Sequence, residues 1–165
     1  DVYKKYPSIY RYSFDEVIRY LYENKDRLAL FHEINGIKYL NADDISRLVD
    51  EFYAEVRLHP RLGPIFNTRL EGKWPAHLDK LKAFWRSVLL TTGEYYGRPV
   101  PAHNGIAELE ETDFALWLNL FDTTIDRIFE PYGRIVIKDK ARRIARSLWF
   151  ARFGTPFNAP PEWAA

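Results

Sequence analysis

The chain has 165 residues, 47% of them hydrophobic and 16% aromatic, which predicts one globular domain and excludes a disordered chain; it has no cysteine, hence no disulfide, thiolate metal site or thiol nucleophile. The net charge is +1, and its basic excess on the last predicted helix lacks the glycine and stacking pattern of nucleic-acid binders, so a solvated helix face is favoured. No apolar run approaches the roughly 18 residues of a membrane span and no signal peptide is visible, so we expect a cytoplasmic protein without a membrane partner.

The first 40 residues are patterned mainly as helix. Ser13 to Glu16 form a capping-box signature, and apolar residues follow on one face. Residues 24–34 are predicted to continue as helix with a glycine stop, although Asn35-Gly36 could instead be a hairpin turn between two short strands. We expect residues 1–40 to form an N-terminal extension. It either packs as an added helix or two on the main domain or offers a surface for a partner or a second copy.

The strongest helical signal follows this extension. Asn41 is a cap residue, Pro60 ends the pattern, and a continuous apolar stripe lies between them. Residues 61–73 are predicted to form a loop with one helical turn near Ile65-Phe66. Pro75 suits the first turn of the next helix, which is expected to stop at Thr92-Gly93.

The second half of the chain predicts two more long helices. Residues 94–111 contain too many prolines and glycines for a regular helix. Thr112 or Asp113 is expected to cap a helix that ends at Pro131-Tyr132-Gly133, and the last helix is expected over about 135–153. The sequence therefore predicts an all-α protein with a main domain over residues 41–153 and a loose tail over 154–165.

Three polar aromatic side chains lie on apolar helix faces. Tyr53, His77 and Trp117 each share a stripe with aliphatic or aromatic neighbours, and a buried phenol, imidazole or indole needs a hydrogen-bond partner. Singly, each has an ordinary explanation as a core-edge residue that points its polar tip at a carbonyl. His103 follows a proline-rich stretch and, taken alone, is an exposed loop histidine. No hydrolytic motif or nucleotide-binding loop is present.

Several stretches in order from about residue 41 to 150 resemble the truncated haemoglobins of the third class. They are VDEFYAEVR, LGPIFN, Trp74-Pro-Ala-His77, FWRSVLL, GEYYGRPVPAH and FALWLNLF. The resemblance implies a shortened globin with helices packed two over two around haem b. It covers about two thirds of the chain, and residues 1–40 have no counterpart in it.

The resemblance also implies roles for individual residues. His103 would be the proximal iron ligand, Tyr53 the distal tyrosine, His77 the distal-helix histidine and Trp117 the pocket tryptophan. The remaining haem contacts implied in this way are Phe66, which wedges against the haem face, Leu81, one turn beyond His77, and Lys80, which could reach a propionate or simply be solvated.

The function implied is binding of O₂, with CO, NO or peroxide as further ligands, at a five-coordinate iron in a polar distal pocket. Tyr53 and Trp117 would stabilise bound O₂ by donating hydrogen bonds, whereas His77 could donate, act as a gate or bind iron itself. A haem peroxidase or NO dioxygenase served by a reductase partner is the alternative. A haem-free helical interaction module, suggested by the tyrosine-rich start and the basic last helix, ranks below both.

Overall fold

The structure, a computed structural model, describes residues 40–90, 92–93, 95 and 106–164. Its helices are α4 (Ala42–Leu58), α5 (Leu62–Leu70), α6 (Trp74–Leu90), α8 (Glu111–Ile128), α9 (Pro131–Phe153) and the short 3₁₀ helix η2 (Glu162–Ala164). No strand occurs among these residues, which confirms the all-α prediction. None of the described helices is long and apolar enough to cross a bilayer.

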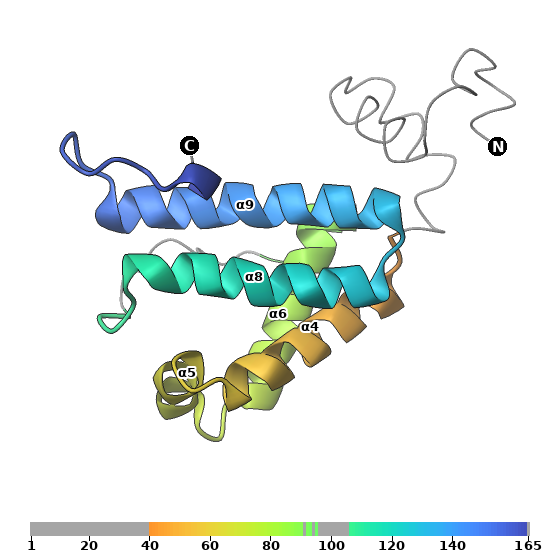
Figure 1. Cartoon of the computed structure of the whole chain (residues 1–165). Coiled ribbons are helices and arrows are strands. Elements are labelled where there is room, and N and C mark those ends of the chain that lie inside the picture. Colours follow the sequence, from red (N-terminus) through yellow and green to blue (C-terminus); the bar gives the residue numbers. More distant parts are fainter. Residues whose placement is uncertain (1–39, 91, 94, 96–105, 165) are drawn as a thin grey trace, which may run out of the picture.

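The long helices form two crossed layers. Figure 1 shows α8 and α9 side by side in opposite directions, with α4 and α6 crossing them on one side. Contacts between α4 and α8 join the layers, and α4 also packs against α5 and α6. The centre is built from rings, since Phe52 of α4 meets Phe121 of α8 edge to face at 4.9 Å and Trp85 of α6 lies 5.1 Å from Phe121.

Helix α4 forms as its sequence predicts. The Asn41 side chain accepts a hydrogen bond from the backbone N–H of Asp44 at 2.9 Å, which satisfies one of the free donors of the first turn. Its apolar stripe is wholly buried. The buried residues are Ile45, Leu48, Val49, Phe52, Tyr53 and Val56. This helix is therefore the central support of the fold.

The sequence prediction for residues 61–73 is wrong, because the structure has a full helix, α5, where a loop with one turn was expected. Pro64 is tolerated since it lies in the first turn, where backbone N–H groups have no helical partner. Gly63 lets α5 approach the end of α4: a Cβ at this position would lie 2.6 Å from the carbonyl oxygen of Arg57. His59 helps to begin α5, because its Nδ1 accepts from the backbone N–H groups of Arg61 and Leu62.

Helices α8 and α9 both begin earlier than predicted. The cap of α8 is Glu110, and Asp113 is the third helical residue, whose carboxylate accepts from the Glu110 N–H at 2.8 Å. Helix α9 begins at Pro131 itself, because a proline without an N–H suits the first helical position. Only Phe129 and Glu130 therefore lie between the end of α8 and the start of α9.

The segment after α9 packs more closely than the sequence indicated. The Asn158 amide donates to the carbonyl oxygen of Phe153 and to Glu111, which folds the chain back. The ring of Trp163 then stacks on Phe114 with centroids 6.1 Å apart. The predictions for residues 1–39 and for most of 94–105 lie outside the described residues.

Candidate functional site

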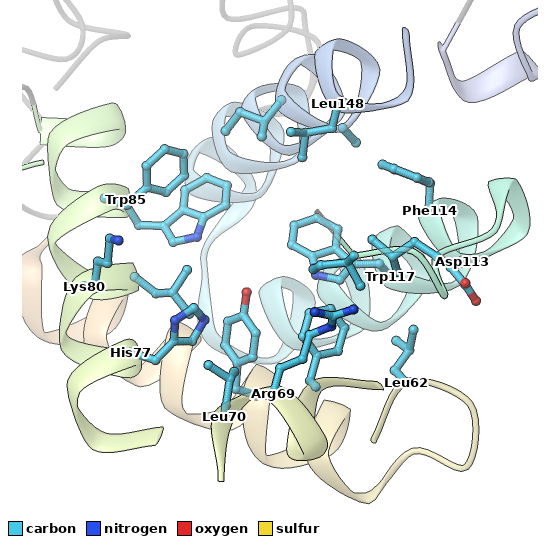
Figure 2. Close-up of a pocket in the computed structure, with 18 of the residues that line it drawn as sticks. Leu62, Arg69, Leu70, His77, Lys80, Trp85, Asp113, Phe114, Trp117 and Leu148 are labelled. Carbon is cyan, nitrogen blue, oxygen red and sulfur yellow. The ribbon is translucent and has the colours of Figure 1, made fainter. Parts of the chain in front are cut away.

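A cavity of about 450 Å³ opens between the two layers, within the range of small-molecule and cofactor sites. Tyr53 of α4 reaches it together with side chains of α5, α6, α8 and α9. Figure 2 shows His77 of α6 and Trp117 of α8 reaching in from two sides, with Leu148 of α9 over the same space. The apolar lining includes Leu62, Phe66, Leu70, Leu81, Phe84, Phe114 and Ile144. A flat apolar group would therefore be shielded from water on both faces.

Tyr53 places a neutral phenol in this apolar setting. The side chain is 8% exposed, and burial raises the pKa of its hydroxyl far above the usual value, against the opposing effect of a hydrogen bond with Trp117. An indole nitrogen can only donate, so Trp117 acts on the pKa as a donor directed at the phenol oxygen. The Tyr53 hydroxyl consequently keeps its own proton at every physiological pH.

His77 stands beside Tyr53 at the same end of the cavity. The ring centroids of these residues are 6.3 Å apart and nearly perpendicular, at 89°. Trp74, one turn earlier on α6, also presents its ring edge-to-face to His77, at 5.9 Å and 80°. The imidazole thus lies within an aromatic corner formed by α4 and α6.

Trp117 is held against the core by two aromatic rings. It stacks on Phe121 at 4.8 Å and meets Phe52 edge to face at 5.2 Å. These contacts fix the plane of the indole, so its N–H keeps one direction. A donor fixed in this way needs little reorganisation when it acts on a ligand or on Tyr53.

Two cationic side chains lie at the edge of the cavity. Lys80 was a sequence candidate, whereas Arg69 of α5 was missed, because an arginine in a segment expected to be a loop looks solvated. Arg69 forms an ion pair with Glu108, and both side chains are partly exposed. Cations at the edge of an apolar cavity suit a ligand whose carboxylates reach toward water.

Asp113 is a second residue that the sequence did not reveal as part of the cavity wall. Its side chain is 4% exposed and is bound by both Nε and Nη2 of Arg61, at 2.9 and 2.8 Å. Burial raises the pKa of the Asp113 carboxyl, but the hydrogen bonds from Arg61 and Glu110 and the charge of Arg61 outweigh it and hold the pKa below its usual range. This pair ties the residue that precedes α5 to the first turn of α8.

Six of the seven predicted site residues line the cavity together. They are Tyr53, Phe66, His77, Lys80, Leu81 and Trp117. The seventh, His103, lies outside the described residues, so its role as an iron ligand stays a prediction. Within the described part of the chain, no three His, Cys, Asp or Glu side chains are grouped to hold a metal ion. A porphyrin metal needs no such group, since the macrocycle supplies four ligands.

The fold is that of a truncated globin. The chain is similar to the crystal structure of the group III truncated hemoglobin from Campylobacter jejuni, with a TM-score of 0.65 and 29% identity over 73% of this chain and 95% of that one. It is also 32% identical over 109 residues to the group 3 truncated hemoglobin ctb of Campylobacter jejuni, a match that covers 64% of this chain and 86% of that protein. No family model matches the sequence. The chain belongs to the group 3 truncated hemoglobin family.

Proposed function

We propose that the cavity holds haem b and that the protein binds O₂ and related diatomic ligands beside Tyr53. The observation that carries the proposal is the composition of the cavity, which combines apolar walls, two cations and the polar aromatics Tyr53, His77 and Trp117. Haem has the matching chemistry, with an apolar ring and two propionates. Arg69 and Lys80 are the proposed propionate partners, and His103 is the proposed axial ligand.

Bound haem would supply an iron atom with one open position for a diatomic ligand. The chain would supply the surroundings of that ligand. Apolar residues such as Leu81 and Phe66 exclude water and leave few polar groups to compete for the ligand. A ligand that gains negative charge on binding, as O₂ does, is then stabilised mainly by the donors that the protein fixes in place.

The Tyr53 hydroxyl is the proposed principal donor. The Trp117 N–H, which lowers the pKa of this phenol, can act on it only as a donor to its oxygen, so the phenol O–H is available to point at a ligand. Accepting one hydrogen bond polarises the phenol and strengthens the bond that it donates. Trp117 would therefore act partly through Tyr53 rather than as an independent second donor. A hydrogen bond to a charged acceptor contributes about 1.5–3 kcal/mol, enough to slow ligand release about ten-fold or more.

A second candidate function is turnover of peroxide or NO. It is favoured by the position of the His77 imidazole beside the Tyr53 phenol, since the pair offers a proton acceptor and a proton donor at the same end of the cavity. Catalytic turnover would need electrons from a reductase partner. Stopped-flow measurements separate the two functions: slow O₂ release with little consumption of peroxide supports ligand binding, and the reverse supports turnover.

The first experiment is an absorbance scan of the purified, reduced protein with and without CO. A strong band at the violet edge of the spectrum that shifts with CO is the expected result. A protein that binds no haem and shows no such band would contradict the proposal and favour a haem-free interaction module. The His103→Ala variant, which should lose normal haem retention, tests the axial ligand separately.

A further inference from the structure

Asn67 joins three helices, α4, α5 and α6. Its amide nitrogen donates to the carbonyl oxygen of Arg57, near the end of α4, at 3.0 Å. Its amide oxygen accepts from the indole N–H of Trp74, the first residue of α6, at 3.2 Å. Because Asn67 itself belongs to α5, one side chain links the end of α4 to the start of α6. Both ends of the amide are used, which fixes its orientation.

Trp74 is held on its face as well as at its nitrogen. The guanidinium of Arg57 lies 4.8 Å from the centre of the indole, within the range of a cation–π contact. The indole is 5% exposed, so these contacts are largely shielded from water. Gly72, with φ +70°, makes the turn that delivers Trp74 to this position directly after α5. The indole therefore has a single defined place between α4 and α6.

The fixed indole forms one wall of the His77 environment. Its ring is 5.9 Å from the His77 ring at 80° and 6.0 Å from the Tyr53 ring at 53°. His77 would give up its edge contact with the indole if it rotated out toward solvent. Figure 2 shows His77 directed into the cavity from α6. An aromatic edge contact contributes about 0.5–1.5 kcal/mol, which is enough to change the share of inward and outward rotamers several-fold.

We propose that Trp74, locked by Asn67 and Arg57, is a positioning residue that keeps the His77 side chain inside the cavity and so limits access of diatomic ligands. The inference rests on the proposed function, because it assigns a role in ligand access. In this proposal the inward imidazole, which lines the cavity beside the Tyr53 phenol, stands in the way of a ligand that approaches that phenol. Releasing the indole lets His77 spend more time outside, and ligand association becomes faster.

The test compares Asn67→Leu with Thr68→Val in the full-length, haem-loaded protein. Asn67→Leu removes both hydrogen bonds at similar side-chain size. Thr68→Val removes a hydroxyl that bonds only to the Pro64 carbonyl within α5, and it is the matched control. Flash photolysis of the CO complex should give about five-fold faster CO association for Asn67→Leu and no change for the control, since loss of about 1 kcal/mol corresponds to that factor. Equal rates in the two variants would overturn the proposal.

Trp74→Phe breaks the same hydrogen bond at its donor, because it keeps an aromatic ring but removes the N–H that donates to Asn67. It should speed CO association similarly, and combining it with Asn67→Leu should add little, because both variants break the same hydrogen bond. Full additivity would show that the two residues act separately and would overturn the proposal.

NMR of the haem-free full-length chain tests the lock independently of haem. The imidazole resonances of His77 should shift in Asn67→Leu and stay in place in Thr68→Val. A chain that never binds haem but shows this shift refutes the proposed function and keeps the lock. Normal haem binding with unmoved imidazole resonances refutes the lock and keeps the proposed function.

Discussion

Replacing Tyr53 with phenylalanine removes one hydroxyl and leaves the packing of the ring intact. The ring would keep its edge contact with Phe52 at 4.8 Å and its contact with Trp74 at 6.0 Å. The lost interaction is one hydrogen bond to a ligand that carries partial charge, about 1.5–3 kcal/mol. The Trp117 N–H also lines the cavity and can donate to the ligand in place of Tyr53. We therefore expect the low end of this range and O₂ release about ten-fold faster.

The assay is stopped-flow displacement of O₂ by excess CO, with CO dissociation measured in parallel. CO carries less charge than O₂ when bound, so its release should change little. Tyr132→Phe is the matched control, because Tyr132 is a buried phenol of α9 that does not line the cavity. An O₂ release rate that is the same in Tyr53→Phe and in the wild type would refute the assignment of Tyr53 as the donor.

Three further variants test the surroundings of the cavity. Asp113→Asn should cost about 2 kcal/mol in urea denaturation at pH 7, because it weakens a bidentate pair with Arg61. The pKa of the wild-type Asp113 carboxyl is lowered in the folded state, so its contribution to the free energy of unfolding is present above about pH 4 and is lost at lower pH. Below about pH 4 the stability of the variant should therefore fall less steeply than that of the wild type. Parallel curves of unfolding free energy against pH would contradict this. Gly63→Ala should destabilise the protein by about 1–3 kcal/mol, since the added Cβ would meet the Arg57 carbonyl at 2.6 Å, and an unchanged urea midpoint would argue against this close approach. Arg69→Gln should speed haem transfer to apomyoglobin about two- to five-fold, as expected for a partly exposed ion pair, and an unaltered rate would remove Arg69 from the propionate site.

The parts of the fold that were predicted from sequence are those fixed by local chemistry. Helix α4 has a side-chain cap at Asn41 and a stripe that repeats with helical period, so its start and its buried face follow from neighbouring residues. Helix α5 was not predicted, because its sequence contains Gly63 and Pro64, and glycine and proline generally disfavour a helix. In the structure the proline falls in the first turn and the glycine allows contact with α4, and only the tertiary arrangement shows this.

The candidate site was also only partly predictable from the sequence. Tyr53, His77 and Trp117 were recognised as candidates because a polar aromatic side chain on an apolar helix face needs a hydrogen-bond partner. The resemblance to truncated haemoglobins then predicted that all three line one pocket. Asp113 and Arg69 did not stand out, since an acid near a helix start and an arginine in a polar segment usually face water. The Arg61–Asp113 pair joins residues 52 positions apart, which no local pattern reveals.

Haem binding in this cavity is tested most directly by titrating the purified chain with haem and following the quenching of tryptophan fluorescence. Trp85 and Trp117 both line the cavity, so haem that binds there should quench much of the emission. We expect saturation at one haem per chain and weaker binding in Leu148→Trp, which fills the cavity from α9. No saturable quenching, or equal binding by the filled variant, would contradict the central claim that this cavity is a haem site.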